Sequence, residues 1–192
     1  GVVLFAHGSG SSRHSPRNRR VAAALNEASL ATLLIDLLTP AEEAVDLRTA
    51  HLRFDIALLA GRLTAAADWL AHQPDTRHLR VGFFGASTGA GAALVAAAER
   101  PSAVGAVVSR GGRPDLAGPA LPQVQAPTLL IVGGNDFPVI EMNRTALAQL
   151  RCEKQLVIVP GATHLFEEPG ALDEVARRAC DWFERCLKPR KV

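Results

Sequence analysis

The chain has 192 residues, of which 48% are hydrophobic and 21% are charged, and its formal net charge is +2 at pH 7. This length and apolar content are enough for one substantial core, so we expect a single domain over residues 1–192. The small net charge, without a block of like charges, and the lack of any apolar run of about 20 residues argue against nucleic-acid and membrane partners.

Strands and helices are predicted to alternate along the chain. Short runs rich in Val, Leu and Ile are typical of buried strands and occur at residues 2–6, 31–37, 79–84, 103–109, 128–132 and 155–159. Longer helical stretches fall between or after them, at residues 18–28, 55–72, 88–99, 138–150 and 171–187. Residues 38–53 are expected to form an irregular loop beside a pocket. The alternation predicts a doubly wound α/β fold, with a mostly parallel sheet of about six strands and helices on both faces.

A candidate nucleophile follows the third predicted strand. Residues 85–89 read Gly-Ala-Ser-Thr-Gly, a G-x-S-x-G sequence that leads directly into a predicted helix. A nucleophile elbow strains the backbone of its serine and brings backbone segments close together, and Gly85 and Gly89 relieve that crowding. The alternative is a tight strand-to-helix connection with no catalytic role. We take Ser87 as the candidate nucleophile because a base and an acid follow downstream.

The candidate acid and base follow the last two predicted strands. Gly-Gly-Asn-Asp ends at Asp136 beyond the fifth strand, and Pro-Gly-Ala-Thr-His ends at His164 beyond the sixth. Reactive residues of such sheets gather beyond the carboxyl ends of the strands. We therefore predict His164 as the general base for Ser87 and Asp136 as the acid that orients it. Asp115 is the competing acid, and a helix cap is the competing role for Asp136.

Small residues after the first strand predict an oxyanion hole. The loop that begins Ala-His-Gly-Ser-Gly can present backbone N–H groups toward the nucleophile, and the predicted donors are Ser9 and Thr88. Arginines gather in loops at the same end of the sheet. Arg13 and Arg110 are the best candidates to bind a carboxylate or phosphate group of a substrate. Solvated surface arginine is the alternative in a chain so rich in this residue.

No metal or cofactor is expected. The histidines and carboxylates have no H-E-x-x-H or comparable ligand spacing, and a serine mechanism needs no cofactor. The three cysteines, which also lack a paired spacing, are interpreted as reduced thiols. Reduced thiols favour a cytoplasmic location.

These motifs together resemble those of the α/β-hydrolase superfamily. Residues 5–13, 85–89 and 160–166 look like bacterial proteins of its small, capless dienelactone-hydrolase-like branch, and the resemblance covers essentially the whole chain. Two features differ from that branch. Position 87 is serine, where dienelactone hydrolases proper use cysteine, and the two antiparallel strands that usually open the fold are absent before Gly1.

The resemblance, together with the serine at position 87, implies a carboxylesterase-type enzyme. We expect it to cleave a small, soluble ester, with or without an anionic group, through an acyl-enzyme in an open pocket without a lid. Two alternatives stay open: a non-catalytic binding or regulatory module, and a thioesterase, acyltransferase or peptidase that uses the same three residues. The oligomeric state is not predicted.

Overall fold

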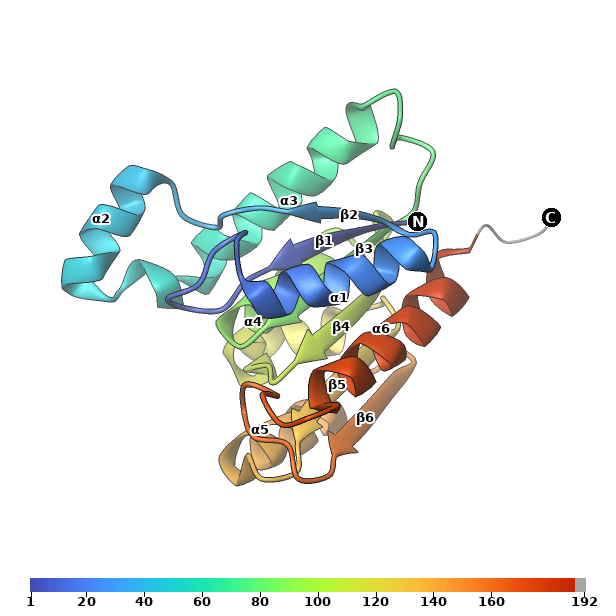
Figure 1. Cartoon of the computed structure of the whole chain (residues 1–192). Coiled ribbons are helices and arrows are strands. Elements are labelled where there is room, and N and C mark those ends of the chain that lie inside the picture. Colours follow the sequence, from blue (N-terminus) through green and yellow to red (C-terminus); the bar gives the residue numbers. More distant parts are fainter. Residues whose placement is uncertain (189–192) are drawn as a thin grey trace.

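Six parallel strands form a single sheet in the computed structural model, which describes residues 1–188 (Figure 1). Their order across the sheet is β2-β1-β3-β4-β5-β6, and each neighbouring pair is parallel. The strands are β1 (Val2–Ala6), β2 (Ala31–Leu34), β3 (Val81–Ala86), β4 (Val104–Arg110), β5 (Thr128–Gly133) and β6 (Lys154–Val159). This arrangement confirms the predicted doubly wound α/β fold.

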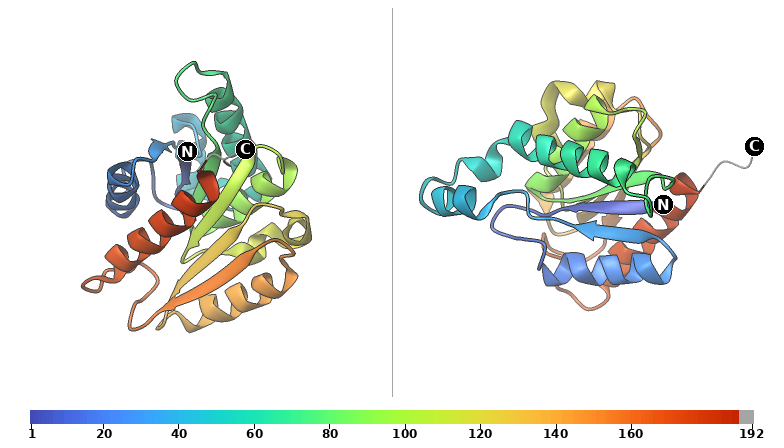
Figure 2. Two further views of the ribbon diagram at one scale, coloured as in Figure 1. Left: turned by 90° about the vertical axis from the view of Figure 1, so that its right-hand side faces the viewer. Right: turned by 90° about the horizontal axis from the view of Figure 1, so that it is seen from above.

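Helices cover both faces of the sheet (Figure 2). They are α1 (Pro16–Glu27), α2 (Pro40–Thr49), α3 (Ile56–His72), α4 (Thr88–Glu99), α5 (Phe137–Gln149) and α6 (Ala171–Leu187), with two 3-10 segments, η1 (Leu52–Phe54) and η2 (Pro114–Gln123). Helices α1 and α6 pack on one face, and α3, α4 and α5 pack on the other. None of the helices within residues 1–188 is both long and apolar enough to span a membrane.

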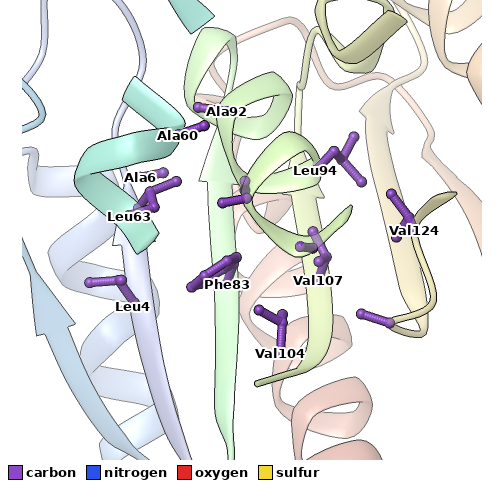
Figure 3. Packing of buried hydrophobic residues seen from close by; sticks show 14 of the residues in the cluster. Leu4, Ala6, Ala60, Leu63, Phe83, Ala92, Leu94, Val104, Val107 and Val124 are labelled. Atoms are coloured by element: carbon purple, nitrogen blue, oxygen red, sulfur yellow. The ribbon is translucent and has the colours of Figure 1, made fainter. Parts of the chain in front are cut away.

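The central strands carry the core because their side chains are buried on both faces of the sheet. Leu4, Phe83 and Val107 pack under α3 and α4 in the larger cluster (Figure 3). Phe5 and Phe84 point to the opposite face, where they pack with α1 and α6. Burial on both sides explains why these strands are nearly continuous apolar runs in the sequence.

The predicted irregular loop over residues 38–53 is wrong, because this stretch contains helix α2. Thr39 caps the helix by accepting a hydrogen bond from the Glu42 backbone, and the Glu42 side chain accepts one from the Thr39 backbone. Pro40 occupies the first turn, where its missing N–H costs nothing. Helix α2 has only one buried residue, so it lacks the apolar stripe on which the helix predictions relied.

Strand β2 is shorter than predicted, ending at Leu34 rather than at residue 37. It lies at the edge of the sheet and pairs only with β1. Beyond it, the Leu37 backbone N–H donates a hydrogen bond to Nε2 of His7 at 3.0 Å. This contact replaces strand pairing and fixes the chain beside the end of β1.

The chain reverses its direction across the sheet between β1 and β3. From β1 the connection through α1 leads outward to β2, whereas from β3 the chain proceeds through α4 toward β4 on the other side. The loops after these two neighbouring strands therefore diverge. In open α/β sheets such a switch point forms a crevice in which ligands bind.

Candidate active site

Ser87 has a strained backbone at the end of β3. Its φ of 50° and ψ of −122° lie in a region that residues with a Cβ rarely adopt. Such strain costs roughly 1–3 kcal/mol and persists only where the surroundings impose it. Here the backbone of Ser87 is held on both sides, because its N–H donates to Arg110 O and its carbonyl accepts from the N–H of Arg113.

Two glycines let the backbone pass closely around Ser87. A Cβ at Gly85 would collide with the backbone of Ala90 on α4, and one at Gly89 would collide with the carbonyl oxygens of Ala6 and His7. The first turn of α4 therefore lies against the end of β1. The G-x-S-x-G sequence has the structural role that was predicted for its glycines.

Asp136 and His164 meet at the same edge of the sheet. His164 Nδ1 lies 2.7 Å from Asp136 Oδ2, across the loops that follow β5 and β6. A carboxylate only accepts hydrogen bonds, so Nδ1 carries the proton and Nε2 is left as an acceptor. The Asp136 side chain is 13% exposed and that of His164 is 40% exposed, so solvent and ligands can reach the imidazole.

Asn135 fastens the loop of the acid to the loop of the base. Its backbone N–H donates to Ala162 O at 2.9 Å and its side chain donates to Gly161 O at 3.0 Å. Gly133 permits this approach, since a Cβ there would collide with the carbonyl of Ala162. Sequence reasoning gave Asn135 no role, because its partners are about 26 residues away along the chain.

The two candidate acids differ in what they contact. Asp115 forms a bidentate ion pair with Arg113, two residues away, and so is engaged within its own loop. Asp136 precedes α5 but its side chain makes no capping hydrogen bond to that helix. Its contact with His164 is therefore not a by-product of helix capping. The geometry favours Asp136 over Asp115 as the partner of the imidazole.

Ser87 and His164 are both next to Gly111, which follows β4. The Ser87 N–H donates to the carbonyl of Arg110, the residue before Gly111. A Cβ at Gly111 would lie 3.5 Å from His164 Cε1 and 3.0 Å from its carbonyl oxygen. Among the residues that the structure describes, Ser87 Oγ makes no hydrogen bond to the imidazole. Such contacts are often loose without substrate and tighten when it binds.

The two predicted oxyanion donors line one cavity. It has a volume of about 280 Å³, and both Ser9 and Thr88 are part of its wall. Neither backbone N–H donates to another group within residues 1–188. Thr88 opens α4, where backbone N–H groups have no partner inside the helix. Gly8 brings the loop close, because a Cβ at this residue would lie 3.0 Å from Ser87 Cβ.

His7 holds the loop after β1 in place. Its Nε2 accepts from Leu37 N–H at 3.0 Å, so its Nδ1 carries the proton and donates to Gly8 O at 2.9 Å. The ring thereby ties the loop of Ser9 to the end of β2. These two hydrogen bonds give His7 a structural role.

The cavity wall is partly apolar and partly lined by ion pairs. Leucine side chains come from the segment between β2 and α2, from α2 and from α3, namely Leu37, Leu38, Leu47 and Leu59. Arg13 also lines the cavity, but its guanidinium is paired with Asp36, which offsets its charge. Arg53 is paired in the same way with the buried Asp46. An anionic substrate group would have to compete with these carboxylates.

Arg110 is not part of this cavity wall. It is 7% exposed, and it ends the central strand β4 whose backbone holds Ser87. The structure therefore separates the two arginines that were predicted together as substrate-binding residues. Arg13 lies at the cavity with its charge paired, whereas Arg110 is buried away from it.

The three thiols are not arranged for chemistry. Cys152, Cys180 and Cys186 form no disulfide, and burial raises the pKa of each of them. Within residues 1–188, no three His, Cys, Asp or Glu side chains are grouped as metal ligands.

Comparisons with known proteins agree with the fold and with the family that the sequence resembles. The model of the dienelactone hydrolase family matches residues 22–189. Dienelactone hydrolase from Anabaena variabilis ATCC 29413 has 71% sequence identity and a TM-score of 0.96, with 98% of this chain and 87% of that chain covered. Est1E from Butyrivibrio proteoclasticus has a TM-score of 0.78 at 16% identity, with 96% and 87% covered, and so shares the fold.

A curated relative from Mycobacterium tuberculosis has a different kind of name. The protein of strain H37Rv named "Putative phosphoribosyl transferase" is 64% identical over 183 residues, which are 95% of this chain and 40% of that protein. This chain therefore spans about two fifths of the length of the curated relative. The family match and the Anabaena structure both cover most of the present chain, which belongs to the dienelactone hydrolase family of α/β-hydrolases.

Proposed function

We propose that the chain is a serine hydrolase that cleaves small, soluble carboxylic esters through an acyl-enzyme. His164 takes the proton of Ser87 as its oxygen attacks the ester carbonyl, and Asp136 holds the imidazole and stabilises its positive charge. The backbone N–H groups of Ser9 and Thr88 bind the oxyanion that develops. His164 then protonates the departing alcohol, and water releases the acyl group by the same steps.

One observation supports this proposal most strongly. A strained serine at a strand-to-helix elbow and a 2.7 Å Asp136–His164 contact both adjoin the chain at Arg110 and Gly111, after β4. The strained backbone of Ser87 costs stability, and the Asp136–His164 contact requires two loops to approach each other closely. Neither feature is needed to form the sheet. A purely structural connection after β3 would not need a positive φ at a serine.

The cavity favours small acyl or alcohol groups. Its volume of about 280 Å³ lies near the lower end of the range for small-molecule sites. Four leucines provide an apolar surface, and the paired arginines leave little free charge for an anion. Uncharged short-chain esters are therefore the proposed substrates. The name of the M. tuberculosis relative belongs to a protein more than twice as long, and we infer no transferase activity from it.

A labelling experiment with a matched control tests the proposal. Wild type, Ser87→Ala and Ser102→Ala are incubated with p-nitrophenyl acetate and, separately, with a fluorophosphonate probe. Ser102 is exposed in the turn before β4 and serves as the control. We expect turnover and an adduct at Ser87 in wild type and Ser102→Ala, and neither in Ser87→Ala. A folded wild type without turnover or adduct would instead favour a binding module.

A further inference from the structure

Arg110 is a buried cation that has no ion-pair or hydrogen-bond partner for its guanidinium within residues 1–188. It is 7% exposed, its Nε and Nη1 are fully buried, and none of its guanidinium nitrogens donates a hydrogen bond to another group within residues 1–188. Buried charges in folded proteins are normally paired and hydrogen-bonded, since their removal from water is otherwise very costly. An unpaired guanidinium at the end of a central strand therefore indicates that a partner from outside the chain completes it.

The side chain of Arg110 lies on the face of the sheet that α1 and α6 cover. Ala106 and Val108 belong to the core cluster on that face, and Arg110 follows them in the alternation of the strand. Ser109 points to the opposite face, where a Cβ at Gly112 would collide with its hydroxyl. The guanidinium is thus separate from the cavity that Ser9 and Thr88 line.

A second arginine and a helix terminus add positive charge at this place. Burial, and to a lesser extent the charge of Arg17, lowers the pKa of Arg110 to about 10, so the group stays protonated at neutral pH. Arg17 lies in the first turn of α1, and its Nε is also buried and makes no hydrogen bond to any residue that the structure describes. The first turn of α1 has no acidic residue to balance the positive end of the helix dipole. Within residues 1–188, Arg110 makes no ion pair and Arg17 is paired with Glu167 through Nη1 alone. These free N–H groups, together with the helix N-terminus, favour a multiply charged anion.

The two glutamates near Arg17 do not neutralise Arg110. Arg17 contacts Glu167 through Nη1 at 3.2 Å, and Glu168 accepts a hydrogen bond from Thr163 at 2.6 Å, but neither carboxylate bonds to Arg110. A hollow of about 400 Å³ opens to the surface beside Arg17 and is lined by Glu167 and Glu168 and by the ion pair of Arg20 and Asp173. Arg110 lies behind Arg17 and is not part of the wall of this hollow. Glu168 Oε2 is buried and has no hydrogen-bond partner in the described part of the chain. A hydrogen phosphate ion, unlike a carboxylate, can donate a hydrogen bond to such an oxygen as well as accept from arginine.

We propose that Arg110 and Arg17 form a binding site for a phosphate group, on the α1 and α6 side of the sheet and apart from the cavity beside Ser87. The phosphate oxygens accept from both guanidinium groups and offset the repulsion between them. The site adjoins the backbone that holds Ser87, because the carbonyl of Arg110 accepts from the Ser87 N–H.

Thermal unfolding and calorimetric binding of inorganic phosphate test this site, with sodium chloride at matched ionic strength as the reference. The variants are Arg110→Met and Arg17→Met, and Arg113→Met is the matched control. Arg113 lies in the same loop and loses the same charge, but it is paired with Asp115. We expect phosphate to raise the melting temperature of wild type and Arg113→Met, and affinity to fall by at least about tenfold in Arg110→Met and Arg17→Met.

The stability of Arg110→Met without phosphate gives an independent result. In phosphate-free buffer this variant should melt at or above the temperature of wild type, because it loses an uncompensated buried charge. With phosphate present, wild type should melt at a higher temperature than Arg110→Met. A phosphate shift that is equal in wild type and Arg110→Met would overturn the proposal. So would a large loss of stability in phosphate-free Arg110→Met, since it would mean that groups of the chain itself hold the guanidinium.

Two further measurements test the phosphate site independently of the proposed esterase activity. They also show whether the site holds a free anion. Ser87→Ala should bind phosphate as wild type does, whether or not the protein hydrolyses esters. Turnover of p-nitrophenyl acetate is then measured with and without phosphate. An unchanged KM is expected and identifies a free anion that is held apart from the cavity. A KM that rises with phosphate would mean that the anion competes with the ester inside the cavity, and it would overturn a separate site.

Discussion

Replacing Asp136 with asparagine tests the proposed acid directly. The amide keeps the shape of the side chain but removes the charge that faces His164 Nδ1 across 2.7 Å. When His164 takes the proton of Ser87, the imidazolium then lacks its counter-charge. Two unit charges about 4 Å apart interact by roughly 4 kcal/mol at an effective dielectric constant of about 20. Since about 1.4 kcal/mol corresponds to a factor of ten in rate, kcat should fall by roughly a thousandfold.

Asp115→Asn provides the matched control for this prediction. It removes the same charge from the competing acid, whose carboxylate is paired with Arg113 rather than with a histidine. Initial rates of p-nitrophenyl acetate hydrolysis are compared for both variants, together with their melting temperatures. Asp136 makes no capping hydrogen bond, so Asp136→Asn should stay close to wild type in stability. Loss of turnover in Asp115→Asn, with Asp136→Asn still active, would refute the reasoning.

Three further predictions concern packing, loop position and pH. Gly89→Ala should lower the free energy of unfolding by about 1–3 kcal/mol, because its Cβ would collide with two carbonyl oxygens, whereas Gly61→Ala on α3 meets nothing within 4 Å and should be neutral or stabilising in denaturant titrations. Asn135→Ala should reduce kcat roughly tenfold with little change in KM, since it frees the loop of the acid; an unchanged kcat would show that the backbone hydrogen bond of Asn135 suffices. Two arginines on α6 lower the pKa of Glu174 to about 2 from its ordinary 4.5, so its stabilising effect is present above pH 4.5 and is lost as the pH falls toward 2. Glu174→Gln should therefore lower the melting temperature slightly at pH 7, since the pair contributes at most about 1 kcal/mol to the free energy of unfolding at this surface position. In calorimetric scans near pH 2, wild type and variant should melt at the same temperature.

The fold class could be predicted because its signal is local. Buried parallel strands are short apolar runs, and the six runs in this sequence correspond to the six strands of the sheet. The elbow is local as well, since G-x-S-x-G must lie between a strand and a helix. Helix α2 was missed for the opposite reason. It has one buried residue, and its only strong signal is the capping box between Thr39 and Glu42.

The sequence by itself determined the order of the elements and the residue types at the ends of the strands. It narrowed the catalytic candidates to Ser87, His164 and a choice between two aspartates. That choice needed the tertiary structure, because Asp115 and Asp136 both follow strands and only their contacts distinguish them. Asp115 is paired with an arginine two residues away, and Asp136 is in contact with His164.

Only the tertiary structure decided which arginines are paired with a carboxylate. Arg13 and Arg110 are equivalent in sequence, since each follows or ends a strand in a chain rich in arginine. In the folded chain Arg13 lies beside Asp36, 23 residues away, whereas Arg110 is buried beside Arg17 and has no acidic partner among residues 1–188. Whether a charge is paired depends on which distant segments the sheet brings together, and no local pattern encodes that.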